Sequence, residues 1–389
     1  MIRQSGGSAP TLAAAAVEIR DKVQRPRLRL ASLDDYEQIR AVQSANGLST
    51  KSREQWLHLW QNNPACWELP GWPAGWVLEN ESGSIVGALE NLPCLYRLGG
   101  RKFVCAFGRG WAVEPAYRVY ALQLVVSQMR QANVDLLITT TAGSRTTELL
   151  TRSGWSQAPV GRWDRSAVWV TNYAETARSC LVKTPRLVSS LAGPILSATL
   201  RWKVAAPWRA RRPEGRWKLR WCADFDKRFE RFWQELEEQS SRRMLAVRST
   251  QTLQWHFKYA LQENRLAILS ASDGGGRMIA YAVFERRPVP SLGAERALLI
   301  DFQTLVADCD LVAAMISFAV ERYREEGVPI MENVGCWLEA RQPLTHRPLF
   351  RRVLGSWSYL YYSKNQELAR TLRDPEPWYP TQFDADASL

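Results

Sequence analysis

The 389-residue chain repeats one order of predicted elements twice, and this repetition constrains the fold more than any single motif. Residues 27–172 and, more loosely, residues 218–365 each indicate two helices, a hairpin, a strand, and then helix, strand, helix and strand. The helix of TELLTRSGW (147–155) has a predicted counterpart in PLFRRVLGSW (348–357). Hairpins require antiparallel pairing, whereas the later strand–helix–strand implies a parallel crossover. The sequence therefore predicts an α/β fold of two tandem units, each a mostly antiparallel mixed (α+β) sheet flanked by helices.

Domain boundaries follow from where the predicted elements stop and the composition changes. An apolar content of 46% and eighteen Trp residues are sufficient for packed cores. We expect the acidic C-terminal tail and the REEG turn at 324–327 to be solvated. The predicted parts are a flexible N-terminal arm (1–26), a first domain (27–177), a basic linker rich in Trp (178–221), a degenerate second domain (222–366) and the tail (367–389).

Cysteine and histidine usage disfavours metal sites and disulfide frameworks. The seven Cys residues are scattered, none forms a CxxC motif, and the chain has three His residues. No run of eighteen apolar residues indicates a membrane-spanning helix, and the first residues are a poor match to a secretory signal. We therefore predict a cytoplasmic protein without a bound metal.

The net charge of +12 is concentrated in one segment. Residues 178–221 hold eleven Lys or Arg residues and one acid, interspersed with Trp and aliphatic residues. One interpretation is a linker that packs its apolar side chains on both halves and leaves its charges solvated. A second is peripheral contact of residues 186–217 with anionic lipid at the inner face of the membrane, because Trp and cations suit such an interface. Nucleic-acid binding is the least favoured interpretation.

The stretch WAVEPAYRVYALQL (111–124) is typical of a strand that passes through a Pro turn into a helix. Unpaired N–H groups and the helix dipole at such a start bind pyrophosphate, and a nearby Arg adds a charge-assisted contact. Arg118 lies three residues after the Pro. The stretch is either a cofactor-binding arm or an ordinary Pro-started helix with an exposed Arg.

The repeated element order, together with Val113, Pro115 and Arg118 in a V-x-P-x-x-R pattern, resembles the GCN5-related N-acetyltransferase superfamily. SRTTELLTRSGW (144–155) is similar to a second signature of that family. The family has small residues three and five positions after the Arg, where this chain has Ala and Gln. The resemblance implies that acetyl-CoA or another acyl-CoA is bound as a substrate by Val113, Arg118, Val119, Ala121, Gln123 and Ser144.

The positions that carry acid–base chemistry in the family are altered here. Leu150 occupies the place of the family's Tyr general acid and cannot donate a proton. Asp301, in LLIDFQ on the second half's equivalent strand, and Glu332 on the next strand are the candidate catalytic carboxylates. A cap or an ion-pair partner is the alternative role for Asp301. His256 follows a helical pattern and is predicted to pack rather than to catalyse, and His346 is a weaker candidate still.

The resemblance implies an acyl-CoA-dependent N-acyltransferase acting on a small-molecule or lipid-linked amine. The tail WYPTQFDAD (378–386) is similar to tails of proteins encoded with polysaccharide-assembly enzymes, which implies an amino sugar in polysaccharide or envelope biosynthesis. Two alternatives stay open. One is a non-catalytic scaffold of this fold, indicated by Ala121, Gln123 and Leu150. The other resembles the Fem-type aminoacyl transferases, which would use aminoacyl-tRNA bound to the basic segment.

Overall fold

A computed structural model describes residues 24–180, 216–289, 293–341, 350–355, 357–384 and 388–389. The chain divides into two compact units. Unit 1 contains the described residues up to Pro93 together with Ala106–Val134, and unit 2 contains Cys94–Cys105 and the chain from Asp135 onward. Most of the predicted arm (1–26) and of the basic linker, including nearly all of 186–217, lies outside the described residues, as does His346.

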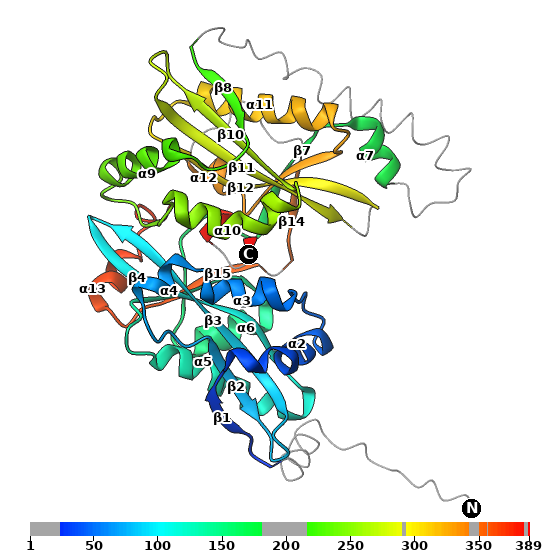
Figure 1. Ribbon diagram of the computed structural model, residues 1–389, viewed down its shortest axis with the longest axis vertical. Coiled ribbons are helices and arrows are strands. Elements are labelled where there is room, and N and C mark those ends of the chain that lie inside the picture. The colour runs from blue at the N-terminus through cyan, green and yellow to red at the C-terminus, as the bar shows by residue number, and fades with distance from the viewer. Residues whose placement is uncertain (1–23, 181–215, 290–292, 342–349, 356, 385–387) are drawn as a thin grey trace, which may run out of the picture. The chain divides into compact units, whose positions relative to one another are not determined.

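Unit 1 is built on antiparallel strands in the order β1, β2, β3, β4, with β3 and β4 continuing into unit 2 (Figure 1). Tyr36, Ile39 and Val42 follow helical spacing in the sequence, and all three are buried on the inward face of α2. The elements of this part are β1 (Arg27–Leu30), η1 (Leu33–Asp35), α2 (Tyr36–Ala45), α3 (Arg53–Gln61), α4 (Pro64–Glu68), β2 (Gly75–Glu79), β3 (Ile85–Leu98), β4 (Arg101–Val113), η2 (Pro115–Tyr120) and α5 (Ala121–Arg130).

Side chains satisfy the first N–H groups of several helices in unit 1. Ser32 and Ser52 form capping boxes with the residue three positions on, and Asn63 accepts from the backbone of Ala65 ahead of Pro64. The helix predicted over 116–131 is two elements, because the first turn is the 3₁₀ segment η2 and the α-helix begins afterwards. The start of this helix is thus unlike the other starts in the unit.

Unit 2 contains a seven-stranded sheet in the order β14, β7, β13, β12, β11, β10, β8, and a group in which β15 lies between β5 and β6. All neighbours in the seven-stranded sheet are antiparallel except β12 and β13, so the predicted parallel crossover is confirmed. Its elements are β5 (Leu136–Ala142), α6 (Ser144–Arg152), β6 (Ser156–Gln157), β7 (Arg165–Val170), α7 (Tyr173–Cys180), β8 (Lys218–Cys222), α9 (Lys227–Gln239), β9 (Leu245–Ala246), α10 (Thr250–Gln262), β10 (Leu266–Ser272), β11 (Met278–Val289), β12 (Ala294–Thr304), α11 (Cys309–Glu325), β13 (Ile330–Val334), α12 (Trp337–Arg341), β14 (Phe350–Val353), β15 (Ser358–Tyr362), α13 (Gln366–Thr371) and η4 (Gln382–Asp384).

Helices cover both faces of the seven-stranded sheet (Figure 1). Tyr281 and Phe284 are three residues apart on β11 and therefore point to opposite faces. The α9 rings of Phe229 and Phe232 contact Tyr281, whereas Tyr323 of α11 contacts Phe284. The ring contacts therefore place α9 and α11 on opposite faces, which gives the mixed sheet flanked by helices that the sequence predicts.

Three strands differ from the sequence interpretation. Strand β7 was expected to close the first half but pairs with β13 and β14, and β15 was expected to close the second half but pairs with β5 and β6. Residues 350–353, expected to be helical, form β14 against β7. Periodicity identifies a strand but carries no information on its partner, so exchange of the closing strands is invisible in the sequence. The linker also ends earlier than expected, since β8 begins at Lys218.

Residues 377–384 of the C-terminal tail are largely buried, which corrects the prediction of a solvated tail for that part. Most of residues 367–376 and the REEG turn are exposed, as expected. Trp378 donates from Nε1 to the Leu372 carbonyl, and the Phe383 ring lies against the rings of His256 and Phe257. His256 is therefore packed, as predicted. No helix in the described ranges is both long enough and apolar enough to cross a membrane.

Candidate functional site

The predicted cofactor arm lies in unit 1, immediately after β4. Val113 is buried, Arg118 and Val119 are exposed, and Ala121 and Gln123 are half-buried on the first turn of α5. Glu114, at the position before η2, makes no side-chain cap bond, and no acid lies in the first turn. Within the described chain the guanidinium of Arg118 has no ion pair. The arm therefore presents a cation beside an uncapped helix start, which is the electrostatic requirement for binding phosphate.

The winding of this start differs from an ordinary α-helical start. A 3₁₀ turn bonds each N–H to the carbonyl three residues earlier, as the Tyr117 amide does to Glu114. Fewer amides are consequently left for a ligand than at an α-helical start, and Arg118 carries more of any phosphate contact. Ser144, the other predicted contact, is the exposed first residue of α6 in unit 2.

Two glycines lie on β4 rather than in the arm. Gly110 has a φ of 60°, and a Cβ there would come within 2.2 Å of Gln43 Nε2. A Cβ on Gly108 would meet Gln128 of α5 at 3.2 Å. These glycines let polar side chains approach the strand that leads into the arm.

A buried carboxylate fixes that part of β4. Glu90 of β3 is 2% exposed and accepts from Arg109 Nη1 at 2.6 Å, from Gln43 Nε2 at 2.8 Å and from Trp56 Nε1 at 2.8 Å. Gln43 also donates to the Gly110 carbonyl at 3.3 Å. Because all these partners are satisfied together, Glu90 positions β4 and is not a free base. Glu90 belongs to no motif, so its role is not recognisable from the sequence.

Asn91, which follows Glu90 on β3, connects that strand to α5 through hydrogen bonds. Its Oδ1 accepts from Gln128 Nε2 at 3.0 Å, and its Nδ2 donates to Gln131 Oε1 at 3.0 Å. Gln128 is 2% exposed and lies on the buried face of α5. The buried face of α5 therefore combines this polar network with the apolar side chains of Leu124 and Val125. This network sets the direction of the helix that begins at the arm.

Asp301, the first candidate base, is fully buried on β12 in unit 2. Arg248 donates to both of its oxygens, from Nε at 2.9 Å and from Nη2 at 3.2 Å, and Tyr281 and Gln303 donate at 2.8 and 2.9 Å. Arg248 also donates to Asp384 Oδ1 at 3.0 Å. One buried cation thus holds two buried carboxylates, one of them from the C-terminal tail.

The pKa values of the two carboxyl groups move in opposite directions. Burial alone would raise the pKa of Asp301, but the charge and hydrogen bonds of Arg248, with those of Gln303 and Tyr281, lower it below its usual value. Burial raises the pKa of Asp384 despite Arg248. Asp301 is therefore held ionised and fully bonded, an arrangement that serves the fold and leaves no oxygen free for an amine proton.

Glu332, the second candidate, is 1% exposed on β13. It pairs with Arg296 at 2.6 Å and Arg352 at 2.7 Å, and Ser166 donates to it as well. Asp301 and Glu332 do not contact each other or share a partner among the interactions of the described residues. The structure thus brings each candidate acid to Arg side chains rather than to one common site.

The strands β12 and β13 diverge at their carboxyl ends. Their parallel pairing runs from Arg296 with Ile330 to Leu298 with Glu332, and β12 then continues to Thr304. Arg341 of α12 occupies the opening, donating from Nη1 to the Phe302 carbonyl at 2.6 Å. The carboxyl ends of diverging parallel strands are a common place for ligands.

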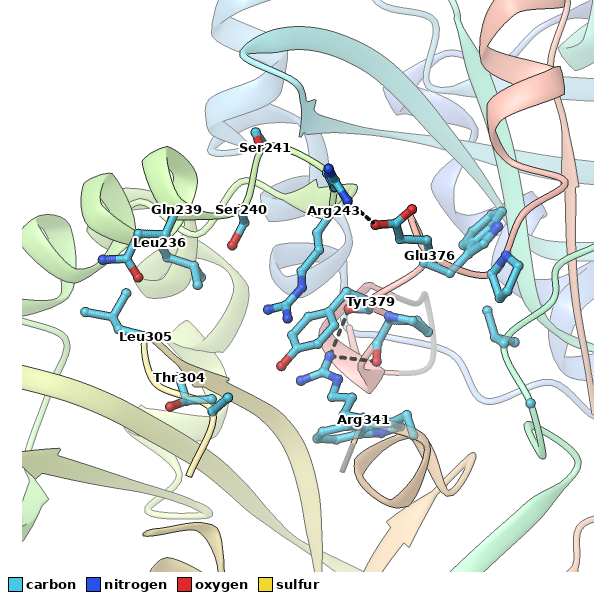
Figure 2. Close-up of a pocket in the computed structure, with 18 of the residues that line it drawn as sticks. Leu236, Gln239, Ser240, Ser241, Arg243, Thr304, Leu305, Arg341, Glu376 and Tyr379 are labelled. Atoms are coloured by element: carbon cyan, nitrogen blue, oxygen red, sulfur yellow. Dashed lines mark hydrogen bonds and ion pairs between the residues drawn. The ribbon is translucent and has the colours of Figure 1, made fainter. Parts of the chain in front are cut away.

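A cavity of about 840 Å³ lies beside this opening, wholly within unit 2 (Figure 2). It is lined by parts of the loop at 159–161, the end of α9 with residues 240–243, the segment 304–307, α12 and residues 375–380. Three guanidinium groups and one carboxylate line it, and the carboxylate, Glu376, pairs with Arg242 at 3.3 Å. The lining is therefore positively charged overall.

No family model matches the chain, and no curated protein is significantly similar to it in sequence. Solved structures are similar in fold. A GCN5-related N-acetyltransferase from Anabaena variabilis ATCC 29413 aligns with a TM-score of 0.53 at 13% identity, over 88% of this chain and 74% of that one. A conserved protein of unknown function and probable N-acyltransferase from Enterococcus faecalis V583 gives 0.55 at 9%, over 87% and 72%. N-myristoyltransferase from Saccharomyces cerevisiae, with bound myristoyl-CoA, gives 0.51 at 10%, over 88% and 79%.

The chain has the GCN5-related N-acetyltransferase (GNAT) fold. The start of η2 in unit 1 and the start of α11 in unit 2 differ in charge. In unit 2, Asp308 caps α11 by accepting from the amides of Asp310 and Leu311, and Asp310 lies in the first turn. In unit 1 the corresponding start has Arg118 and no acid in its first turn, and the carboxylate of Glu114 before it makes no cap bond. Within the described residues, no three His, Cys, Asp or Glu side chains form a metal-binding group.

Proposed function

We propose that the protein is an acyl-CoA-dependent N-acyltransferase, with the cofactor arm of unit 1 as the site for the acyl-CoA phosphates. The single observation that carries this proposal is the uncapped, cationic start at Arg118. A dianionic pyrophosphate is attracted to such a start and repelled by an acid-capped one such as that of α11. The GNAT fold supports acyl transfer as the class of reaction, and the bound myristoyl-CoA of one structural neighbour supports an acyl-CoA donor.

The reaction would be direct transfer in a ternary complex. The amine nitrogen attacks the thioester carbonyl, an N–C bond forms, the C–S bond breaks, and CoA leaves as the thiol with the proton that the amine loses. Because Asp301 and Glu332 are both held in ion pairs, positioning of the two substrates and hydrogen bonds from backbone N–H groups to the developing oxyanion would supply most of the rate acceleration.

The acceptor would be a small-molecule or lipid-linked amine. An amino sugar of polysaccharide or envelope biosynthesis is the class that the similarity of the tail implies. Peripheral contact of residues 186–217 with the inner face of the membrane would bring the enzyme to a lipid-linked acceptor.

Thiol release tests the reaction itself. The purified protein is incubated with acetyl-CoA or myristoyl-CoA and with glucosamine or another primary amine, and free CoA thiol is measured together with the N-acylated product. We expect amine-dependent thiol release matched by amide product. Binding of acyl-CoA with no thiol release for any amine would instead support the non-catalytic scaffold, which the 3₁₀ winding and Gln123 favour.

A further inference from the structure

The cavity of unit 2 contains a guanidinium whose bonding is incomplete. Arg341 Nη1 donates to the Phe302 carbonyl, and Nη2 donates to the carbonyls of Tyr379 and Pro380, each at 2.8 Å. Its Nε is buried and has no hydrogen-bond partner, and no carboxylate of the described residues forms an ion pair with the group. Burial lowers the pKa of Arg341. The charges of Asp301 and Asp384 act on the group in the opposite direction, but neither carboxylate forms an ion pair with it. A buried cation without a direct carboxylate partner is costly, which supports an anion at this site.

A second donor of the same lining is also unsatisfied. Trp337, one helical turn before Arg341 on α12, is 1% exposed, and its indole Nε1 has no hydrogen-bond partner. The Arg341 guanidinium lies over the Trp337 ring at 4.8 Å from the ring centroid. Both side chains line the cavity, so its wall contains two buried N–H donors without acceptors.

A third group adds charge at the open side. Arg243 and Arg341 both lie over the ring of Tyr379, at 4.4 and 3.5 Å from its centroid (Figure 2). Arg243 is exposed, and among the described residues its guanidinium has no carboxylate partner. Its neighbour Arg242 is different, since it is paired with Glu376. Tyr379 thus holds two cations close together, although like charges repel.

We propose that this cavity binds a small ligand through a carboxylate or phosphate group, with Arg341 and Arg243 as the anion-binding residues. The volume suits a ligand larger than a simple ion. Gln239, Ser240 and Thr304 line the remainder and provide polar contacts for its uncharged part. The site is separate from the acid-capped start of α11 and does not depend on acyl transfer by unit 1.

Isothermal titration calorimetry tests the site with two probes, inorganic pyrophosphate and citrate, added to the full-length protein. We expect saturable binding of one or both, and the preferred probe identifies a phosphate or a carboxylate ligand. Arg243→Gln weakens that binding about tenfold, because one charge-assisted contact is lost. Arg231→Gln, a control with the same change in charge on the exposed side of α9 and outside the cavity lining, alters it less than about twofold.

Arg341→Lys keeps the positive charge but removes the planar guanidinium group with its several N–H donors. We expect this substitution to abolish binding of the preferred probe. Thermal melting checks that this variant is folded. If it is not, the binding test rests on Arg243→Gln, which should fold because Arg243 makes no buried bond. No binding of either probe at 10 mM, or equal losses in Arg243→Gln and Arg231→Gln, overturns the proposal. Acetyl-CoA binding, measured in the same samples, separates this outcome from failure of the proposed function.

Discussion

Replacing Arg248 with Met leaves Asp301 and Asp384 buried without their shared cation. Met fills much of the volume of Arg, so the main effect is electrostatic. Removal of one partner from a buried ion pair costs about 3–5 kcal/mol of folding free energy. Arg248 is 1% exposed and serves two carboxylates that are 0% and 3% exposed, so we expect a loss at the upper end of that range. This is a large part of the roughly 5–15 kcal/mol that stabilises a typical domain.

Calorimetric melting and urea denaturation measure the effect. At roughly 2–4 °C per kcal/mol for a domain of this size, the transition of unit 2 should fall by about 6–20 °C. Arg242→Met is the control, since Arg242 is 82% exposed and its replacement should change the free energy of unfolding by about 0.5 kcal/mol or less. Adding Asp384→Asn to Arg248→Met should recover part of the loss by removing one uncompensated charge. A loss below about 1 kcal/mol for Arg248→Met, or no recovery, would refute the buried ion cluster.

Two further predictions concern glycine geometry and pH. Gly110→Ala should destabilise unit 1 by about 2 kcal/mol or more, because φ is 60° and the new Cβ displaces Gln43, whereas Gly83→Ala, with a φ of 79° but open space, should cost about 1 kcal/mol. Equal losses in the two melting curves would contradict this reason. The stability advantage of the wild type over Asp301→Asn should be full above the ordinary Asp pKa of 3.8 and shrink as pH falls through the lower folded-state pKa of Asp301. Melting temperatures from pH 2.5 to 7 measure it, and an advantage that grows on acidification would show that the sign is wrong.

The element order, the mixed sheets and the parallel crossover were predictable because local patterns specify them. The apolar stripe of α2 and the continuous buried run of β12 are properties of a few consecutive residues. The exchange of β7 and β15 was not predictable, since pairing partners far apart in the sequence leave no local pattern. The local pattern of residues 348–357 predicts a helix, but pairing with the distant β7 makes residues 350–353 the strand β14.

The candidate site was less predictable than the fold. Asp301 was identified as a carboxylate on a buried strand, but its partner Arg248 is 53 residues away and Asp384 lies in a segment whose composition indicates solvent exposure. Arg341 lies on a helix of five residues and carries no motif, and its cavity is assembled from five separate segments. Glu90 is similarly inconspicuous. The surroundings of Asp301, Arg341 and Glu90 are determined by contacts between residues far apart in the sequence. Composition and periodicity carry no information on such contacts.

The central claim is that Arg118 and the uncapped start of η2 bind the phosphates of acyl-CoA. Calorimetric titration of the full-length protein with acetyl-CoA and myristoyl-CoA tests it most directly. We predict saturable binding of at least one donor, weakened about tenfold by Arg118→Ala through loss of a charge-assisted contact. Arg130→Ala, which removes an exposed Arg from the far end of the same helical segment, should change the affinity less than about twofold. Absence of binding by both donors, or equal losses in the two variants, would contradict the claim.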